Sequence, residues 1–301
     1  MKLLLTGAFK YTDQNLSILK NLGHDIIIHQ DEKMPLSIDV SNIEAVICNA
    51  LFVYNDIKEF NQLKYVQLTS AGYDRVPIEY IKRNNINIFN AHNVYSVPMA
   101  EWVTLKILEF YKSSSFFFEN QKRRTWEKKR DLLEMKNKTV SIIGYGNVGK
   151  EVAKRLASFD MKLIAVDVIR PKCQCVEEFF EINELYSALR QSDVVVLTLP
   201  LTKETYHLID EDALNQIKDQ ALIINVARGS IIDEKALVKQ LKHGRFGGVG
   251  LDVFEDEPLQ KTSELWNFKN VSVTPHNAFI SEGNDERLFS LIVKNLKEIK
   301  V

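Results

Sequence analysis

Cysteine is scarce in this chain, with three residues among 301. A disulfide framework of the kind that stabilises small secreted domains is therefore excluded. Two of the three cysteines, Cys173 and Cys175, form an isolated C-x-C pair, which we interpret as two surface thiols in a reduced compartment. A cytoplasmic location is the expectation that follows.

The chain also lacks any apolar run near the roughly 20 residues that a membrane-spanning helix needs. Gly7 and Lys10 interrupt the leucine-rich start before it reaches the length of a signal-peptide core, so this start is expected to form a first buried strand. The chain has 39 Lys and Arg residues and 40 Asp and Glu residues, so neither sign of charge dominates. This balance argues against a nucleic-acid or membrane partner. The six histidines are scattered, and no metal site is expected.

Short apolar runs alternate with stretches of helical spacing along the whole chain, which is long enough for about two domains. Strands that alternate with helices indicate parallel, doubly wound sheets, so we expect an α/β fold with two such sheets. The strands expected in the first sheet are Lys2–Thr6, Asp25–His29, Glu44–Cys48, Lys64–Thr69 and Asn85–Phe89. Those expected in the second are Thr139–Ile143, Lys162–Val166, Asp193–Leu197, Ala221–Asn225, Phe246–Leu251 and Val271–Val273.

A glycine-rich turn, Gly144–Gly149 (GYGNVG), directly follows an expected strand and precedes helical spacing over Lys150–Phe159. In a dinucleotide site the first glycine permits a tight turn, the second lets the backbone approach the pyrophosphate, and the third lets the helix pack on the strand. The helix N-terminus then faces the phosphates. The order of strand, turn and helix therefore predicts dinucleotide binding.

An acidic residue, Asp167, lies about 20 residues beyond the glycine turn, at the end of the next expected strand. Its carboxylate would bind a ribose 2′-hydroxyl and repel the 2′-phosphate of NADP. Arg170 could instead pair with that phosphate. We expect NAD as the cofactor, with NADP as the alternative that Arg170 keeps open.

The glycine turn lies in the middle of the chain, so a whole domain precedes it. We expect a substrate domain over residues 1–94, completed by the C-terminal helix 281–301, and a dinucleotide-binding domain over residues 95–280. The active site would lie in the cleft between them. The second domain would begin with a long helix, Val97–Tyr111.

Three charged or titratable residues, Arg228, Glu257 and His276, follow the carboxyl ends of three different expected strands. Open α/β sheets bind their ligands at that edge. A guanidinium holds a carboxylate in a fixed fork, and a histidine that titrates near pH 6.5 can transfer protons. Together with the glycine turn, these residues indicate a hydride-transfer enzyme that acts on a small carboxylate.

These motifs resemble those of the D-isomer-specific 2-hydroxyacid dehydrogenases, the family of D-lactate, D-glycerate and phosphoglycerate dehydrogenases. The resemblance covers essentially the whole chain and implies a flavodoxin-like substrate domain and a Rossmann NAD-binding domain. The matching segments are Ser70–Asp74, Asn93, Val97–Glu101, Trp126, Gly144–Gly149, Leu199–Thr202 and Thr205. Arg228, Glu257 and His276 fall on the family's catalytic Arg, Glu and His.

The resemblance implies a role for each of these residues. Arg228 would hold the carboxylate of a 2-oxo acid and polarise its ketone, together with the backbone N–H groups of Ala71 and Gly72. His276 would give or take the proton at the ketone oxygen, and Glu257 would fix and stabilise its imidazole. The residues implied to contact the cofactor are Gly144, Tyr145, Gly146, Asn147, Val148, Gly149, Asp167, Pro200, Thr205, Ala227, Asp252 and His276. The expected reaction is the NAD-dependent reduction of a small 2-oxo acid to the D-2-hydroxy acid, or its reverse.

The residues leave open which 2-oxo acid is used and in which direction and pathway. The run Leu51–Tyr54 (LFVY) either faces the cleft, where it would suit an aliphatic or aromatic substrate, or packs in the local core. No Arg or Lys cluster for a substrate phosphate shows in the first domain, although Arg75 lies beside the Ser70–Asp74 loop. One alternative is an NADPH-dependent glyoxylate or hydroxypyruvate reductase. Another is an NAD(H)-binding corepressor-like protein, although the expected fold elements occupy both ends of the chain and leave no partner-binding tails.

Three consecutive phenylalanines, Phe116–Phe118, lie between a serine run and the basic run Gln121–Arg124. They cannot all face the core from one helix. They therefore form either a buried, irregular packing piece or a subunit interface. In the resembling family the region that corresponds to Val97–Trp126 builds a two-fold dimer, so a homodimer is expected.

Overall fold

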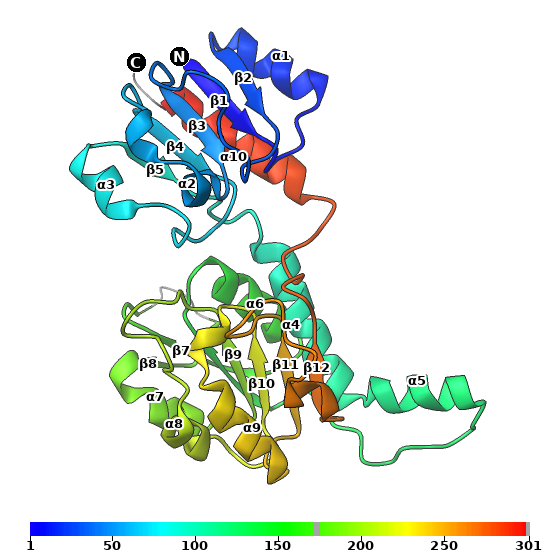
Figure 1. Cartoon of the computed structure of the whole chain (residues 1–301). Helices are drawn as coiled ribbons and strands as arrows, with labels where there is room; N and C mark the ends of the chain where they lie inside the picture. The colour runs from blue at the N-terminus through cyan, green and yellow to red at the C-terminus, as the bar shows by residue number, and fades with distance from the viewer. Residues whose placement is uncertain (171–174, 299–301) are drawn as a thin grey trace. The chain divides into compact units, whose positions relative to one another are not determined.

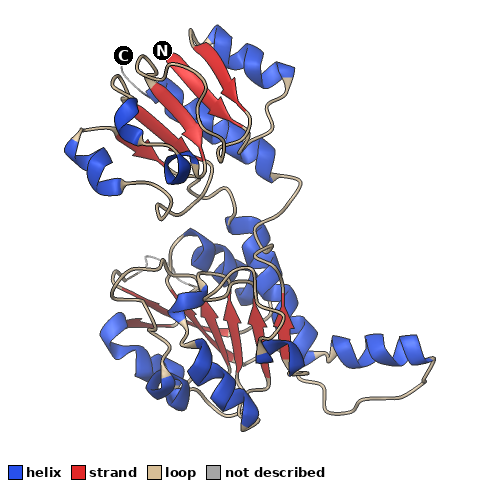
Figure 2. Cartoon of the chain, in the orientation of Figure 1, coloured by secondary structure: helices blue, strands red, loops and turns tan. Residues whose placement is uncertain are grey.

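The computed structural model describes residues 1–170 and 175–298. It divides into two compact units, one formed by Met1–Tyr95 with the chain from Ser281 onward and the other by Ser96–Ile280 (Figure 1). Each unit is built on a wholly parallel sheet with helices beside it (Figure 2). The predicted α/β fold with two doubly wound sheets is therefore confirmed.

The sheet of the first unit has the strand order β2-β1-β3-β4-β5, which is the flavodoxin-like order. The strands are β1 (Lys2–Thr6), β2 (Asp25–His29), β3 (Ala45–Cys48), β4 (Tyr65–Leu68) and β5 (Asn87–Phe89). Every residue of β3 and β4 is buried, because helices cover both faces of a parallel sheet. All five strands end at the same edge, which places the loops that follow them together.

The helices of the first unit are α1 (Asp13–Asn21), α2 (Leu51–Tyr54), η1 (Ile57–Glu59), α3 (Ile78–Arg83) and α10 (Asn284–Glu298). Although α10 comes at the end of the chain, it packs on the first sheet, where Ile292 shares a core with Leu3 and Leu5. The amide of Asn295 also donates to Gln67 Oε1 over 2.8 Å, inside that core. A long-range polar contact therefore fixes the helix on the sheet.

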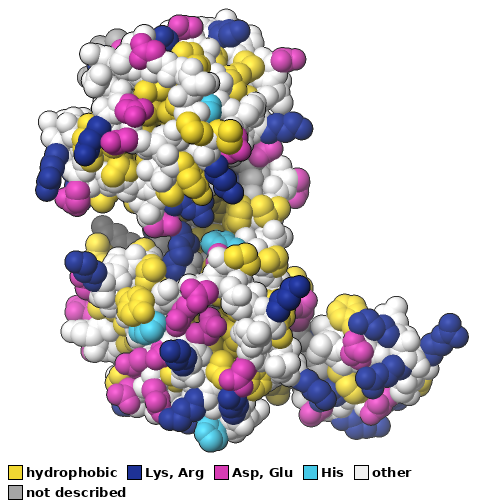
Figure 3. All heavy atoms as spheres, viewed as in Figure 1, with side chains coloured by type: hydrophobic (Ala, Val, Ile, Leu, Met, Phe, Trp, Pro, Cys, Tyr) yellow, Lys and Arg dark blue, Asp and Glu magenta, His cyan; other side chains and the backbone are white. Residues whose placement is uncertain are grey.

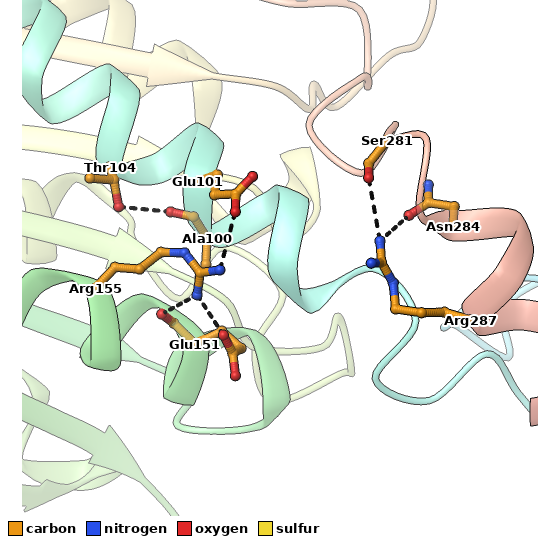
Figure 4. Close-up of polar contacts among 8 residues, drawn as sticks. All are labelled: Ala100, Glu101, Thr104, Glu151, Arg155, Ser281, Asn284 and Arg287. Carbon is orange, nitrogen blue, oxygen red and sulfur yellow. Dashed lines mark hydrogen bonds and ion pairs between the residues drawn. The ribbon is translucent and has the colours of Figure 1, made fainter.

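Arg287 fastens the beginning of α10 to the chain that leaves the first sheet. Its Nε donates to the carbonyl oxygen of Val94 over 2.8 Å, and its Nη2 contacts Asn284 Oδ1 at 2.9 Å and Ser281 Oγ at 3.4 Å (Figure 4). One guanidinium thus joins two segments that are 193 positions apart in sequence.

The sheet of the second unit has the order β12-β11-β10-β9-β6-β7-β8. Taken from β8, this is the Rossmann order with β12 added at the far edge, and the order reverses between β6 and β9. The strands are β6 (Thr139–Ile143), β7 (Lys162–Asp167), β8 (Glu178–Glu181), β9 (Val194–Leu197), β10 (Leu222–Asn225), β11 (Gly248–Leu251) and β12 (Val271–Val273). The strand β8 was not predicted, because its four residues, EFFE, form no apolar run.

The helices of the second unit lie on both faces of its sheet (Figure 2). They are α4 (Ser96–Tyr111), α5 (Ser114–Arg123), α6 (Asn147–Ala157), η2 (Ile182–Glu184), α7 (Leu185–Leu189), α8 (Glu211–Gln216), η3 (Gly229–Ile231), α9 (Glu234–Lys242) and η4 (Glu264–Asn267). On one face α4 packs against α6. Arg155 of α6 contacts Glu151 on its own helix and Glu101 on α4 (Figure 4).

The phenylalanine run lies on α5, which extends away from the sheet of its own unit (Figure 1). The alternative of buried, irregular packing is wrong: the run is helical, and Phe117 and Phe118 are 39% and 60% exposed. Trp126, in the segment that follows, is 97% exposed. We call α5 and the segment that follows it, residues 114–130, the arm. Lys and Arg side chains gather on the arm (Figure 3), and its basic residues are Lys122, Arg123, Arg124, Lys128, Lys129 and Arg130.

The interpretation of the C-x-C pair as two thiols is wrong for Cys175, which is disulfide-bonded. Cys173 lies outside the described residues. Cys48 is a free thiol buried at the end of β3. Of the helices that the structure describes, none has both the length and the apolar composition to cross a bilayer.

Candidate active site

The glycine turn connects β6 to α6 and is shaped by close backbone packing. Gly144 has a φ of +91°, and a Cβ there would lie 2.6 Å from the backbone of Leu199. A Cβ at Gly149 would lie 2.4 Å from the carbonyl oxygen of Gly144. Gly146 instead faces open space and begins α6 without a side-chain cap. Uncapped N–H groups beside an open glycine fit a pyrophosphate.

Asp167 stands at the end of β7, next to the glycine turn. Its carboxylate accepts hydrogen bonds from the backbone N–H groups of Tyr145 and Val168, both over 2.6 Å. The position fits a ribose diol in the predicted dinucleotide site. Arg170 is exposed and lies over the ring of Phe179, 5.8 Å from its centre.

The loop after β9 folds back on itself and forms another wall of this region. The hydroxyl of Thr205 donates to the carbonyl oxygen of Pro200 over 2.7 Å and accepts from the N–H of Thr202. Ala227, after β10, is buried. Asn147 and Val148 form the first turn of α6. The residues predicted to contact the cofactor therefore follow the carboxyl ends of β6, β7, β9, β10, β11 and β12.

Glu257 and His276 form a hydrogen-bonded pair. Nδ1 of His276 lies 2.8 Å from Oε2 of Glu257, and both side chains are about one third exposed, at 36% and 37%. The other carboxylate oxygen, Oε1, accepts the backbone N–H of Phe254 over 3.1 Å. With Nδ1 engaged by the carboxylate, Nε2 is the ring nitrogen left to exchange a proton with a substrate.

Asp252 holds the turn that carries His276. Its side chain is 2% exposed and accepts the Thr274 hydroxyl at 2.5 Å, the Asn277 N–H at 2.8 Å and the Ala278 N–H at 2.9 Å. The N–H of His276 donates to the backbone carbonyl of Asp252 over 2.8 Å. His276 itself has a φ of +51°, and this network supports that less common backbone conformation.

Arg228 follows the end of β10, which is the neighbour of β11 in the sheet. Its Nη1 donates to the carbonyl oxygen of Ala227 over 2.7 Å, and Asn225 Nδ2 donates to the Arg228 carbonyl over 3.0 Å. The next residue, Gly229, lies so close to the backbone of Phe254 that a Cβ would come within 1.8 Å of its carbonyl carbon. The Arg228 turn and the loop that carries Glu257 are therefore packed together.

The Ala71–Gly72 loop follows β4 in the first unit. Asn90 Nδ2 donates to the Ala71 carbonyl over 2.6 Å, and Ser70 Oγ donates to the Gly72 carbonyl over 3.1 Å. Within the described residues, the backbone N–H groups of Ala71 and Gly72 donate to no protein acceptor. The bonds to the two carbonyl oxygens fix the loop, and its two available N–H groups suit the binding of an anion.

For the Leu51–Tyr54 run, the two alternatives were packing in the local core and a position outside it, and the run divides between them. Leu51 is fully buried and Phe52 packs edge-on against Phe60, with ring centres 5.5 Å apart, so these two belong to the core. Val53 and Tyr54 are 56% and 51% exposed. Arg75, beside the Ala71–Gly72 loop, is also exposed.

Sequence reasoning missed a carboxylate pair that supports the Glu257 loop. Glu255 Oε1 accepts the N–H of Glu234 over 2.8 Å, and Glu234 Oε2 accepts the N–H of Glu255 over 3.3 Å. His207 Nε2 lies 3.1 Å from Glu255 Oε1. Burial, and to a smaller extent the charges of Glu255 and Asp256, raise the pKa of Glu234. No local pattern marks this pairing, because its members lie far apart in sequence.

Comparison with known proteins identifies relatives of this chain. The family model described as "D-isomer specific 2-hydroxyacid dehydrogenase, NAD binding domain" matches residues 105–278. A glyoxylate reductase of Thermofilum pendens is 33% identical over 298 residues, which cover 94% of this chain and 87% of the relative. A hydroxypyruvate reductase of Thermotoga maritima is 32% identical over 279 residues, 91% of this chain and 90% of the relative.

A solved structure agrees in fold over nearly the whole chain. The D-lactate dehydrogenase of Aquifex aeolicus, complexed with NAD and lactic acid, matches with a TM-score of 0.80 and 26% identity, covering 98% of this chain and 94% of that one. The resemblance inferred from the motifs and the predicted NAD-binding domain are thus confirmed. The chain belongs to the D-isomer specific 2-hydroxyacid dehydrogenase family and is an oxidoreductase of that type.

Proposed function

We propose that this chain reduces a small 2-oxo acid, glyoxylate or hydroxypyruvate, to the corresponding 2-hydroxy acid, of D configuration where C2 is chiral. The observation that carries the proposal is the Glu257–His276 pair, with the Arg228 turn packed against the loop of Glu257. The substrate class is supported by the relatives named glyoxylate reductase and hydroxypyruvate reductase, each about one third identical over more than nine tenths of this chain.

Arg228 binds the substrate's carboxylate, and the N–H groups of the Ala71–Gly72 loop are further donors that suit an anion. The guanidinium donates in a planar fork that matches the two carboxylate oxygens, and a remaining N–H polarises the adjacent ketone. The N–H groups of Ala71 and Gly72 need no rearrangement, because no protein acceptor among the described residues engages them.

His276 supplies the proton. Reduction of the 2-oxo group adds a hydride to C2 and a proton to the ketone oxygen, and Nε2 of His276 donates that proton. Glu257 holds Nδ1 over 2.8 Å, which orients the ring. In the reverse direction the neutral ring removes the proton from the hydroxyl group.

The glycine turn and Asp167 hold the cofactor. A bound nicotinamide dinucleotide supplies the hydride. The open space at Gly146 would receive the pyrophosphate, and Asp167 would accept a ribose hydroxyl, which favours NADH over NADPH. Asp252 holds His276 and Ala278 in place on the turn that follows β12.

The test is a turnover assay of the purified chain. Oxidation of NADH and of NADPH is followed by the absorbance of the reduced nicotinamide, with glyoxylate, hydroxypyruvate and pyruvate as substrates. We expect glyoxylate and hydroxypyruvate to give the highest kcat/KM, NADH to be preferred, and pyruvate to give D-lactate. Tight NADH binding without turnover of any 2-oxo acid would contradict the proposal and favour the partner-binding alternative.

We also propose that the chain forms a homodimer through α5 and the segment behind it. Phe117, Phe118 and Trp126 are exposed together on this arm. Adjacent exposed aromatic side chains usually mark a contact surface, and two-fold pairing is the commonest closed arrangement.

A further inference from the structure

We propose that Glu32 is a specificity-determining residue: its fixed carboxylate, at the carboxyl edge of the first unit's sheet, selects 2-oxo acids with an uncharged side chain and disfavours those with a second negative charge. The inference rests on the proposed function and narrows its substrate class.

The carboxylate of Glu32 is held rigidly by donors from three other residues. Its Oε1 accepts the hydroxyl of Thr6 over 2.6 Å and the N–H of Asn49 over 2.7 Å, and its Oε2 accepts the N–H of Ala50 over 2.6 Å. Its backbone carbonyl accepts Asn55 Nδ2 over 3.1 Å. Such short, charge-assisted hydrogen bonds fix the position of the carboxylate.

Among the described residues, no Lys, Arg or His forms an ion pair with Glu32. The donors that hold the carboxylate are a neutral hydroxyl and two backbone N–H groups, which orient the negative charge without cancelling it. Within the part of the chain that the structure describes, this edge of the sheet therefore carries a carboxylate that no side-chain cation pairs.

Glu32 lies at the same edge of the first unit's sheet as the Ala71–Gly72 loop, which would bind the substrate's carboxylate. Glu32 follows β2 in sequence. Its carboxylate accepts hydrogen bonds from Thr6 at the end of β1 and from Asn49 and Ala50 at the end of β3. The Ala71–Gly72 loop follows β4, which is the strand next to β3. Neighbouring strands lie about 4.8 Å apart, so the carboxylate is roughly 5–10 Å from a substrate anchored at Ala71–Gly72. That is the distance range of a substrate's second carboxylate or phosphate.

The neighbours of Glu32 show the effect of its charge. Burial is the main cause that raises the pKa of Tyr11 and of Cys48 well above their usual ranges, and the negative charge of Glu32 adds to both shifts. Glu32 therefore already disfavours a second negative charge on the two groups beside it. A dianionic substrate would meet the same repulsion, whereas the hydrogen, methyl or hydroxymethyl group of glyoxylate, pyruvate or hydroxypyruvate would not.

The test compares two 2-oxo acids that are similar in size and differ in charge. Oxaloacetate carries a carboxylate where 2-oxopentanoate carries an ethyl group, so the ratio of their kcat/KM values isolates the second charge. In Glu32→Gln this ratio should rise in favour of oxaloacetate by about 2- to 30-fold, the range expected for two charges about 8 Å apart at the surface of a protein. Gln keeps one acceptor oxygen for Thr6 and Asn49.

Glu44→Gln is the matched control. Glu44 also accepts a backbone N–H, that of Lys2 over 3.0 Å, but it precedes β3 and lies at the opposite edge of the same sheet. We expect both variants to lower the melting temperature and only Glu32→Gln to change the ratio. An unchanged ratio in a folded Glu32→Gln, or an equal change in Glu44→Gln, would overturn the inference and leave the proposed function standing.

A second measurement needs no variant and decides the case if Glu32→Gln does not fold. Electrostatic discrimination is screened by salt, so the wild-type preference for 2-oxopentanoate over oxaloacetate should narrow between about 0.1 M and 1 M salt. A preference that does not change with salt would reject the role of Glu32. Failure of the wild-type chain to reduce any 2-oxo acid would instead reject the proposed function, and the inference with it.

Discussion

Gly229 lies against Phe254 so closely that no side chain fits between them. A Cβ at Gly229 would come within 1.8 Å of the carbonyl carbon of Phe254 and 2.3 Å of the backbone nitrogen of Glu255. Arg228 precedes this glycine, and Glu257 is held by the N–H of Phe254. The contact therefore sets the position of the anion-binding residue against that of the residue that orients the histidine.

The first prediction follows from this contact. Gly229→Ala should lower kcat by at least about tenfold, because the backbone that bears Glu257 must move, and such overpacking also costs about 1–3 kcal/mol of stability. Gly244→Ala is the control for stability alone: its φ of +67° strains an alanine there, but nothing lies within 4 Å of its Cβ position, so this variant should lose stability and keep its kcat. Steady-state kinetics and thermal unfolding of both variants check the prediction, and wild-type kcat in Gly229→Ala would contradict it.

Arg228→Ala should raise the KM for the 2-oxo acid and lower kcat. Together these changes should reduce kcat/KM by about 10- to 100-fold, the loss expected for one hydrogen bond to a charged group. The affinity for NADH, measured by fluorescence titration, should hardly change. Arg190→Ala, an exposed arginine that bonds Gln216, serves as the control. Near-wild-type kcat/KM in Arg228→Ala would remove this residue from the site.

His276→Ala should lose about 10²–10⁴-fold in kcat while NADH still binds, because a general acid contributes a factor of that size. Glu257→Gln should retain more activity than His276→Ala but less than the wild type, since a neutral amide holds Nδ1 less firmly than the carboxylate does. Glu264→Gln, an exposed carboxylate paired with Lys242, should leave kcat unchanged. Wild-type kcat in Glu257→Gln would show that the 2.8 Å contact has no part in catalysis.

Asp167 should determine the choice of cofactor. We expect the wild type to prefer NADH, and Asp167→Ala to narrow the ratio of kcat/KM for NADH to that for NADPH by about tenfold or more. The variant also loses the bond to the N–H of Tyr145, but this loss affects both cofactors and cancels in the ratio. Asp219→Ala, an exposed acid elsewhere in the second unit, is the control. Preference of the wild type for NADPH would mean that Arg170 determines the choice.

The arm should form the dimer contact. Substitution of both Phe117 and Phe118 by Asp should shift the mass measured by light scattering from dimer toward monomer, with NADH affinity unchanged. Phe159→Asp is the control, because Phe159 is 37% exposed in the same unit but belongs neither to α5 nor to the segment that follows it. A wild type that is a monomer at micromolar concentration would contradict the proposal.

The sequence by itself determined the fold class and the position of most site residues in it. Continuous apolar runs such as Leu222–Asn225 form buried parallel strands, and the glycines at 144, 146 and 149 have a local geometric reason to follow a strand and begin a helix. Since Arg228, Glu257 and His276 follow strand ends, their presence at one edge of the sheet could be predicted from the order of strands alone. Strand boundaries were less certain, and β8 was missed.

The tertiary structure decided which of these groups touch. The contact of Glu257 with His276, the hold of Asp252 on Thr274 and the reach of Glu32 to Ala50 join residues from different strands or loops. Hydrogen bonds between segments that are distant in sequence leave no local periodicity, because only the shared packing of the strands brings their partners together. The exposure of Phe117 and Phe118 has the same origin, since helical spacing defines α5 but only the packing of the whole unit decides what covers it.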